Sequence, residues 1–327
     1  MTRDWNLQLR QNAAPLVALT VFVAMFSLFL MQHPRAISIN IITTAANKAV
    51  LLAIVAMAQT LPVVTRGLDL SVGMVMILSS CLASVLVNGT PPGVTFGVIV
   101  VLATGIAAGA FNAAIVVFGR IQPIIVTLAT GAVYFGFALL LRPAPGGDVS
   151  EGLSEALTGN LFGLLPTTLA LLAAIVIFLW IPFRRSVIGR GCYAVGSAEG
   201  AAYLSGVDLK RSKFFAYTFA GLLGSIAGLL LSLISLSGEA SAPQASLYTL
   251  NSIAAVVIGG TSLYGGSGGM IGSIVGAFVL RTIGDLLFVF DAPALWQPLF
   301  EGIILLAAVC LGALHVLRVR NRLDLYS

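Results

Sequence analysis

Apolar runs long enough to cross a bilayer as helices recur along nearly the whole chain. Only 9% of the 327 residues are charged and 58% are hydrophobic, so too little polar surface exists to cover a water-soluble globule. We therefore predict an all-α, polytopic membrane protein with about ten transmembrane helices in a single domain, residues 1–327. The predicted spans lie near residues 13–31, 48–65, 72–88, 94–118, 122–141, 163–182, 213–236, 249–263, 270–289 and 297–315.

Lysine and arginine are divided unequally between the connections of this predicted topology. If the amino terminus is cytoplasmic and every run crosses, the outer connections contain only Arg35, Lys48 and Arg142. Positive charge is preferentially kept on the cytoplasmic side during insertion, so we predict that both termini are cytoplasmic. The inner connections would then contain Arg3, Arg10, Arg66, Arg120, Arg184, Arg185, Arg190, Lys210, Arg211, Lys213, Arg318, Arg320 and Arg322.

Two stretches are poor candidates for continuous helix. Residues 250–276 contain three glycine pairs, and each glycine in a helix costs about 1 kcal/mol relative to alanine. We predict a short or broken helix there beside a transport route, because irregular backbone at membrane depth is buried in protein or lines an aqueous cavity. Close packing of helices through small residues would also explain the glycines. In the second stretch, residues 65–73, Asp69 and Ser71 either cap the next helix or belong to the route.

The sequence argues against several chemistries. A nucleotide-binding P-loop requires lysine directly after glycine, but Lys48, Lys210 and Lys213 all follow other residues, so the chain is not its own ATPase. Neither a metal cluster nor a nucleophile with a base is visible, and we predict no enzyme activity, cofactor or metal. No basic stretch with interleaved aromatic residues indicates nucleic acid. Arg281 and Asp285 can pair on one helix face, either for structure or for gating.

The longest polar connection, residues 184–213, contains a segment rich in small residues. We predict that Ser197 caps a short helix here and that Gly206 ends it. Such a helix has little apolar surface of its own to bury, so we expect it to dock against another protein. Its members include Glu199, Ala201 and Ala202.

Four motifs occur in order between residues 50 and 280. They are Gly67-Leu68-Asp69-Leu70-Ser71-Val72-Gly73, then Gln122-Pro123-Ile124-Ile125-Val126-Thr127-Leu128, then Ala194-Val195-Gly196 with Ala201-Ala202, Gly206-Val207 and Lys210, and finally Ala255-Val256-Val257-Ile258-Gly259-Gly260-Thr261-Ser262-Leu263. Together they resemble the permease subunits of bacterial ATP-binding-cassette importers for monosaccharides, of the ribose and galactose type. In that family the third motif forms the cytoplasmic coupling segment, here residues 184–213, which fits a groove of the ATPase.

The resemblance implies a function and a set of partners. The chain would be a permease domain in the bacterial inner membrane, forming the translocation pathway for a monosaccharide while a separate subunit hydrolyses ATP. Its expected partners are ATP-binding-cassette ATPase subunits, a periplasmic sugar-binding protein and a second permease copy, identical or related. A secondary carrier or facilitator for sugars or small solutes, independent of any ATPase, is the alternative.

Candidate site residues fall into two sets. For contact with the ATPase we select Arg190, Glu199 and Lys210, because exposed charges at a docking surface set its register. The resemblance adds Gly196, Ala201, Ala202 and Gly206. A neutral sugar requires hydrogen-bonding side chains that do not retain it tightly, although an asparagine in an apolar run could equally satisfy a neighbouring backbone group. For the route we select Asp69, Ser71, Asn112, Gln122, Thr127 and Asn251.

Overall fold

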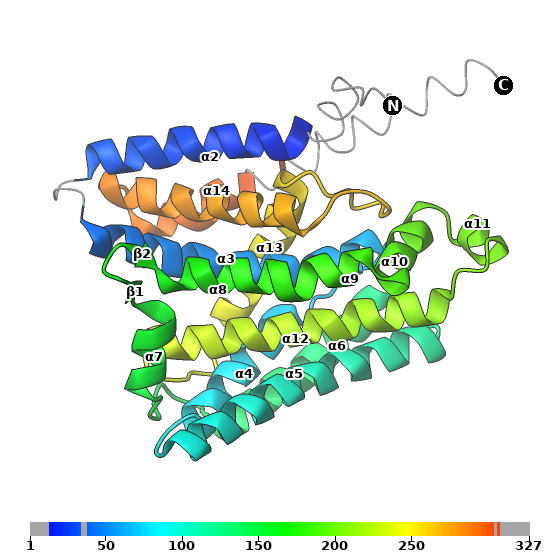
Figure 1. Ribbon diagram of the computed structural model, residues 1–327, viewed down its shortest axis with the longest axis horizontal. Helices are drawn as coiled ribbons and strands as arrows, with labels where there is room; N and C mark the ends of the chain where they lie inside the picture. Colours follow the sequence, from blue (N-terminus) through cyan, green and yellow to red (C-terminus); the bar gives the residue numbers. More distant parts are fainter. Residues whose placement is uncertain (1–12, 34–37, 304–305, 308–327) are drawn as a thin grey trace.

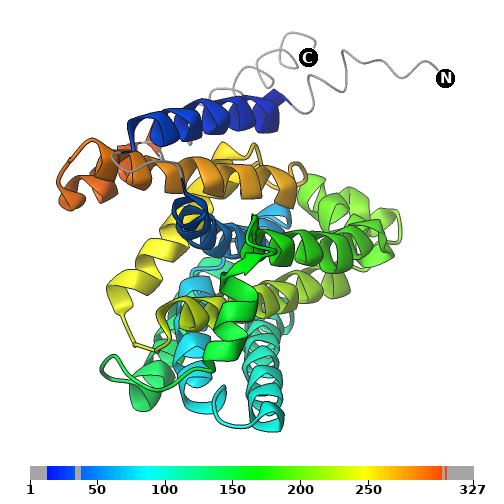
Figure 2. The ribbon, with the colours of Figure 1, turned by 60° about the vertical axis from the view of Figure 1, so that its left-hand side comes forward.

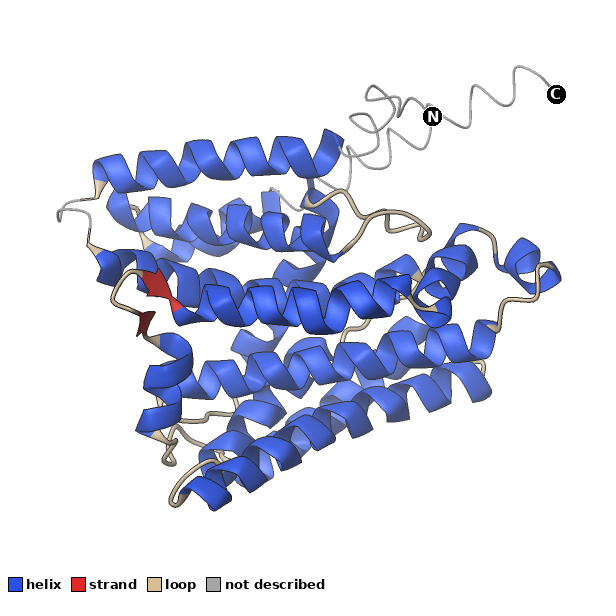
Figure 3. Ribbon diagram, in the orientation of Figure 1, coloured by secondary structure: helices blue, strands red, loops and turns tan. Residues whose placement is uncertain are grey.

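The computed structural model describes residues 13–33, 38–303 and 306–307, and helices make up most of this part of the chain (Figures 1 and 3). Seven helical segments in the described ranges are long and apolar enough to cross a membrane. Each overlaps a predicted span, which confirms the all-α polytopic class. They are α2 (Ala13–Gln32), α3 (Ile39–Val64), α5 (Pro91–Phe118), α6 (Pro123–Leu141), α12 (Leu209–Ser235), α14 (Met270–Val289), and one composite of α8 (Thr167–Ala174), a π-helical turn (Ile175–Trp180) and α9 (Ile181–Arg185).

Two further helices are too short to cross the membrane unaided. α4 (Val72–Leu86) has 15 residues and α13 (Ala242–Ile258) has 17. At about 1.5 Å per residue, both are shorter than the hydrocarbon thickness of about 30 Å. Most of α4 is buried, and it packs against α5, α6 and α12. Protein rather than lipid therefore surrounds α4, which explains how a short helix is accommodated at this depth.

The late glycine-rich stretch differs in detail from its prediction. α13 begins at Ala242 and continues through Asn251 to Ile258, so the predicted short helix exists but lies earlier in the chain. The non-helical backbone is confined to residues 259–269, which we call the glycine loop, because the glycine pairs lie in the connection rather than inside a helix. The tenth predicted span begins as helix at residues 297–303, and most of it lies outside the described residues.

Contacts between connections divide the helix ends into two groups. At one end, α10 (Val187–Ser197) lies beside the end of α3 and the glycine loop, and α11 (Glu199–Leu204) follows it at the edge of the molecule (Figure 1). We call this the coupling end. At the other end lie α7 (Glu151–Thr158) and a small hairpin of β1 (Asn160–Leu161) and β2 (Leu165–Pro166) (Figures 1 and 2). Among the described connections, the one that contains Arg66 and the one that contains Arg184, Arg185 and Arg190 meet at the coupling end.

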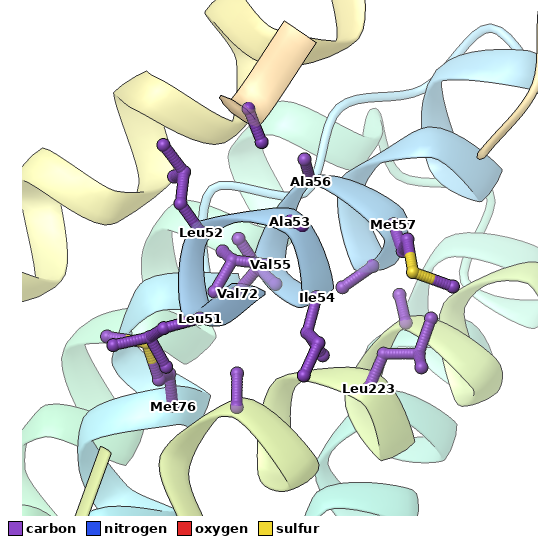
Figure 4. Packing of buried hydrophobic residues seen from close by; sticks show 14 of the residues in the cluster. Leu51, Leu52, Ala53, Ile54, Val55, Ala56, Met57, Val72, Met76 and Leu223 are labelled. Carbon is purple, nitrogen blue, oxygen red and sulfur yellow. The ribbon is translucent and has the colours of Figure 1, made fainter. Parts of the chain in front are cut away.

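α3 forms the centre of the fold. Its residues from Val50 to Ala58 are almost fully buried, because α4, α12, α13 and α14 all pack against it. Figure 4 shows side chains of this cluster, including Leu51, Met76 of α4 and Leu223 of α12. Burial on every side explains why α3 is apolar around its whole circumference from Ala49 to Ala58.

α5 and α12 cross at unusually close range. A Cβ atom at Gly221 would overlap the carbonyl oxygen of Gly105, and one at Gly109 would overlap that of Tyr217. Gly105 and Gly109 are four residues apart, as are Gly221 and Ser225, so small residues on both helices form one strip. This spacing is the small-residue pattern by which membrane helices bring their backbones together.

Candidate functional site

α10 and α11 form the compact part of the coupling segment. Ser186 caps α10 by accepting a hydrogen bond from the Gly189 N–H. The prediction that Ser197 caps α11 is wrong: Ser197 is the last residue of α10, and its hydroxyl donates to the Tyr193 carbonyl oxygen. The end of α11 near Gly206 is as predicted. Gly206 has a φ of 77°, and the N–H groups after α11 bond back to its last turn.

The predicted coupling residues differ in exposure. Arg190 and Lys210 are exposed, as is Ala201, whereas Ala202 is only 5% exposed and packs α11 against the protein. Tyr203 is 70% exposed and Leu204 is 87% exposed, so the end of α11 presents two large apolar side chains that sequence analysis did not select. The sequence indicated them only by their position directly after the Ala201-Ala202 pair.

Glu199 is not a free charge at this surface. Its carboxylate Oε1 lies 2.8 Å from Nζ of Lys213, an ion pair that joins α11 to the first turns of α12. A nearby second pair, Asp208 with Arg211, stabilises the start of α12, where Asp208 also caps the helix by accepting from the Arg211 N–H. An ion pair at the surface therefore links α11 to α12.

Gly196 lies where α10 touches the end of α3. A Cβ there would overlap the Val64 carbonyl oxygen and would lie 2.6 Å from the Gly266 nitrogen. Only glycine fits such an approach of three backbone segments. The structure therefore assigns Gly196 a packing role between the coupling segment and the helix bundle.

Four of the predicted route residues come together around the turn between α3 and α4. Ser71 donates to Asp69 Oδ1 through both its N–H (2.9 Å) and its hydroxyl (2.6 Å). Asn112 of α5 donates to Ser71 Oγ at 2.8 Å, and Tyr134 of α6 lies 2.9 Å from Asn112 Oδ1. Asn112 thus bonds side chains of other elements rather than a neighbouring backbone group. We call these side chains, with those of Thr127 and Gln59, the buried network.

Thr127 and Gln59 complete the buried network from either side. Thr127 Oγ1 accepts from the Leu70 N–H at 3.0 Å. The Gln59 amide, oriented to satisfy both bonds, donates to the Asp69 carbonyl oxygen at 2.9 Å and accepts from the Asp69 N–H at 3.2 Å. Asp69, Ser71, Asn112, Thr127 and Gln59 are each at most 2% exposed. Sequence analysis missed Gln59 and Tyr134, although polar side chains inside apolar runs were the signal.

The cap hypothesis for this turn is partly wrong. Ser71 is the residue before α4, but its side chain makes no cap hydrogen bond to that helix. Asp69 instead accepts from the N–H of Ser71 itself, so the carboxylate braces the turn at the start of α4. Both residues are structural members of the turn and members of the buried network.

Two predicted route residues lie elsewhere. Gln122 is exposed at the start of α6 and contributes no side-chain bond to that helix end. Asn251 of α13 donates to Glu301 Oε2 at 2.9 Å, and Gln297 donates to the other oxygen of the same carboxylate.

Arg281 and Asp285 lie four residues apart on α14, and their side chains approach to a nitrogen–oxygen distance of 3.9 Å.

Cysteine chemistry supports no site in the described ranges. No group of three potential metal ligands occurs among the described residues, and Cys81 and Cys192 are both buried free thiols. In α10, burial raises the pKa of the Cys192 thiol to about 12, and its Sγ donates to the Ser212 carbonyl oxygen. The reactive thiolate is therefore nearly absent at neutral pH.

We expect Cys192 to resist maleimide in the folded protein at pH 8, because burial and the raised pKa both suppress attack. The measurement is labelling in mild detergent compared with labelling in SDS, in a Cys310→Ser background. The matched control is Cys192→Ser in the same background, which reports any labelling of Cys81. Equal labelling of Cys192 in both detergents would contradict its burial.

Comparison with known proteins decides the family. Residues 41–309 match the model for "branched-chain amino acid transport system / permease component". The chain is 32% identical over 305 residues to a ribose import permease protein of Bacillus subtilis, covering 92% of each chain. It is 30% identical over 316 residues to a ribose import permease protein of Escherichia coli, covering 94% of each.

The chain belongs to this permease family. A third relative, an autoinducer 2 import system permease protein of an Enterobacter species, is 33% identical over 303 residues, covering 90% of this permease and 85% of the relative. No solved structure matches the permease. The match confirms a non-catalytic transmembrane component of an ATP-binding-cassette importer, and with it the resemblance stated from the four motifs.

Proposed function

We propose that this permease forms the membrane route for a monosaccharide of the ribose type. The relatives named for ribose import, which match over almost the whole chain, carry the proposal. The buried network supports it by its chemistry, since Ser71, Asn112 and Thr127 are neutral hydrogen-bonding groups of the kind that a polyol needs; here each is buried and bonded within the protein, so the turn must move before a sugar can reach them. A carboxylate such as Asp69 at membrane depth is expensive to bury and is by default a functional candidate. Gln122 and Asn251 remain predicted members of the route.

Uptake measurements test the substrate class. Cells that contain the permease with its cognate ATPase and binding protein should accumulate labelled ribose, and deletion of the permease should abolish this uptake. Leucine is the necessary comparison because the family description names branched-chain amino acids, and autoinducer 2 is the other because a relative is named for it. Uptake of leucine without ribose would refute the monosaccharide proposal.

ATP hydrolysis by a partner would act through the coupling segment. The exposed apolar end of α11, with Arg190 and Lys210 nearby in the chain, offers a surface on which an ATPase subunit can dock. Glu199, Ala201 and Gly206 shape α11, and Ala202 and Gly196 hold the segment against the bundle. The docking end would face the cytoplasm, with both termini inside, in the inner membrane. Fusions of a cytoplasm-dependent fluorescent protein to each terminus test that orientation.

Leu204→Asp is expected to reduce co-purification of the ATPase by about tenfold or more, because burying a leucine contributes about 1.5–3 kcal/mol and 1.4 kcal/mol is tenfold in affinity. The measurement is the ATPase-to-permease ratio after affinity purification. Leu164→Asp is the matched control: Leu164 is 80% exposed in the hairpin at the opposite end. Equal loss in both variants, or in neither, would contradict docking at α11.

Glu199 allows a sharper test of the same contact. Glu199→Lys places a second positive charge beside Lys213 and disturbs α11, whereas Glu199→Lys with Lys213→Glu restores the ion pair in reverse. If Glu199 contacts the ATPase, the double variant remains defective in co-purification. If Glu199 only fixes α11, the double variant recovers.

The remaining partners follow from the same function. A periplasmic sugar-binding protein would deliver the substrate, and two permease copies, identical or related, would enclose one route. The competing proposal is a carrier that works without an ATPase. Uptake in inside-out or right-side-out vesicles that follows the proton gradient and ignores ATP would favour that carrier.

A further inference from the structure

Arg66 lies two residues after the end of α3, in a conformation that usually belongs to glycine. Its φ is 63°, and the N–H groups of Arg66 and Gly67 bond back to the carbonyls of Val63 and Pro62. This is the hydrogen-bond pattern in which a left-handed residue, most often glycine, ends a helix. The corresponding residue after α13 is Gly260, with a φ of 81°. An arginine at such a position is a costly choice for the backbone alone.

The Arg66 side chain reaches two other segments. Its Nε lies 2.7 Å from the Gly196 carbonyl oxygen and 2.9 Å from that of Tyr264, and Nη2 donates to the Ser197 carbonyl oxygen at 2.7 Å. Gly196 and Ser197 are the last residues of α10, where helix carbonyls lack partners within the helix and carry partial negative charge. Tyr264 belongs to the glycine loop. One guanidinium therefore joins the ends of α3 and α10 to that loop.

Other contacts make this junction tight. The Gly266 N–H donates to the Val64 carbonyl oxygen at 2.9 Å, and Tyr193 of α10 donates to the Gly268 carbonyl oxygen at 3.1 Å. A Cβ at Gly265 would lie 2.5 Å from Arg66 Cγ, and Gly265 has a φ of 79°. The glycines thus bring three backbone segments close enough for one side chain to bridge them.

The same turn continues into the buried network. Asp69 is three residues after Arg66, and Gln59 of α3 and Thr127 of α6 bond the backbone of Asp69 and Leu70. These bonds hold the turn between α3 and α4 firmly on both sides. A displacement of α10 would therefore reach the network through one short turn rather than through a long chain of side-chain contacts.

We infer that Arg66 is a positioning residue that ties the coupling segment to the turn bearing Asp69 and Ser71, so that movement of α10 is passed to the buried network. This inference rests on the proposed function, in which an ATPase moves the coupling segment. Arg66 itself touches neither ATP nor substrate. Its role is to keep α10, the glycine loop and the α3–α4 turn moving as one body.

Arg66→Gly is the decisive variant, because glycine suits the positive φ and removes the whole side chain, guanidinium included, without straining the backbone. The complex of permease, ATPase and binding protein is reconstituted in liposomes, and ribose uptake is measured together with ATP hydrolysis. We expect normal co-purification and ATP hydrolysis, with uptake per ATP reduced by at least about fivefold, the lower range of coupling between linked sites. Arg66→Lys keeps the positive charge but lacks the planar guanidinium that donates to several carbonyl oxygens at once, so it should recover uptake per ATP only in part.

Arg211→Ala is the matched control. Arg211 lies in the first turn of α12, is exposed, and within the described part of the chain pairs only with Asp208 three residues away, so its loss should leave uptake per ATP unchanged. Unchanged uptake per ATP in Arg66→Gly would overturn the inference. So would a fall in thermal stability that lowers uptake and hydrolysis in proportion, since Arg66 would then only stabilise the fold. Failure of the unmodified permease to bind an ATPase would instead refute the proposed function.

Discussion

Replacing Gly221 with leucine is expected to remove most of the folded permease. A Cβ at this position would overlap the Gly105 carbonyl oxygen and would lie 2.7 Å from the Gly109 nitrogen, so the new side chain meets backbone atoms that cannot rotate away. α5 and α12 would have to separate, and α12 also packs against α3 and α4. We expect a loss of about 3 kcal/mol or more. Fluorescence-detected size exclusion of a fusion protein measures the folded fraction.

Gly136→Leu is the control for that experiment. Gly136 is also inside a membrane-crossing helix, α6, but a Cβ there would have no atom within 4 Å. The intrinsic gain in helix propensity is the same for both substitutions, so the difference between them measures the close crossing. Similar folded fractions for the two variants would show that α5 and α12 do not approach as described.

Asn112→Leu is expected to abolish sugar uptake and to lower the free energy of unfolding by about 1–3 kcal/mol, the usual result of leaving buried partners unsatisfied. The substitution removes the donor to Ser71 Oγ and the acceptor near Tyr134. Both partners are buried, and no water replaces the lost bonds easily. Thermal unfolding in detergent and ribose uptake in cells measure the two effects.

Tyr134→Phe separates stability from transport in the buried network. It removes one hydroxyl but keeps the bond between Asn112 and Ser71, so we expect a smaller loss of stability than in Asn112→Leu. Asn88→Leu is the control for losing an asparagine, because Asn88 lies half-buried between α4 and α5 and its amide donates, among the described residues, only to backbone carbonyl oxygens. Full uptake in Asn112→Leu at normal expression would exclude the network from the route.

The approximate positions of the apolar helices, and the unequal distribution of basic residues among the connections, could be read from the sequence because each depends only on which residues lie near one another in the chain. The apolar runs predicted the seven long helices, since each run alone meets the length and hydropathy that a bilayer requires. Helix ends were predicted less accurately: α13 begins at Ala242, before the predicted span, because Ser241 caps its first turn by accepting from the Gln244 N–H. The apolar pattern of the sequence also could not show that α4 is short and enclosed by protein, because an apolar run reads the same whether lipid or other helices surround it.

The sequence by itself determined that this chain is a helical permease, because the apolar runs and the four ordered motifs can be read without coordinates. Tertiary structure alone decided which polar residues meet. Asn112 and Ser71 are 41 residues apart in the chain, and Leu70 and Thr127 are 57 apart. A hydrogen bond forms only near 3 Å, a distance set by how neighbouring helices rotate and cross. For the same reason Arg66, an ordinary loop cation in the sequence, proved to join three segments.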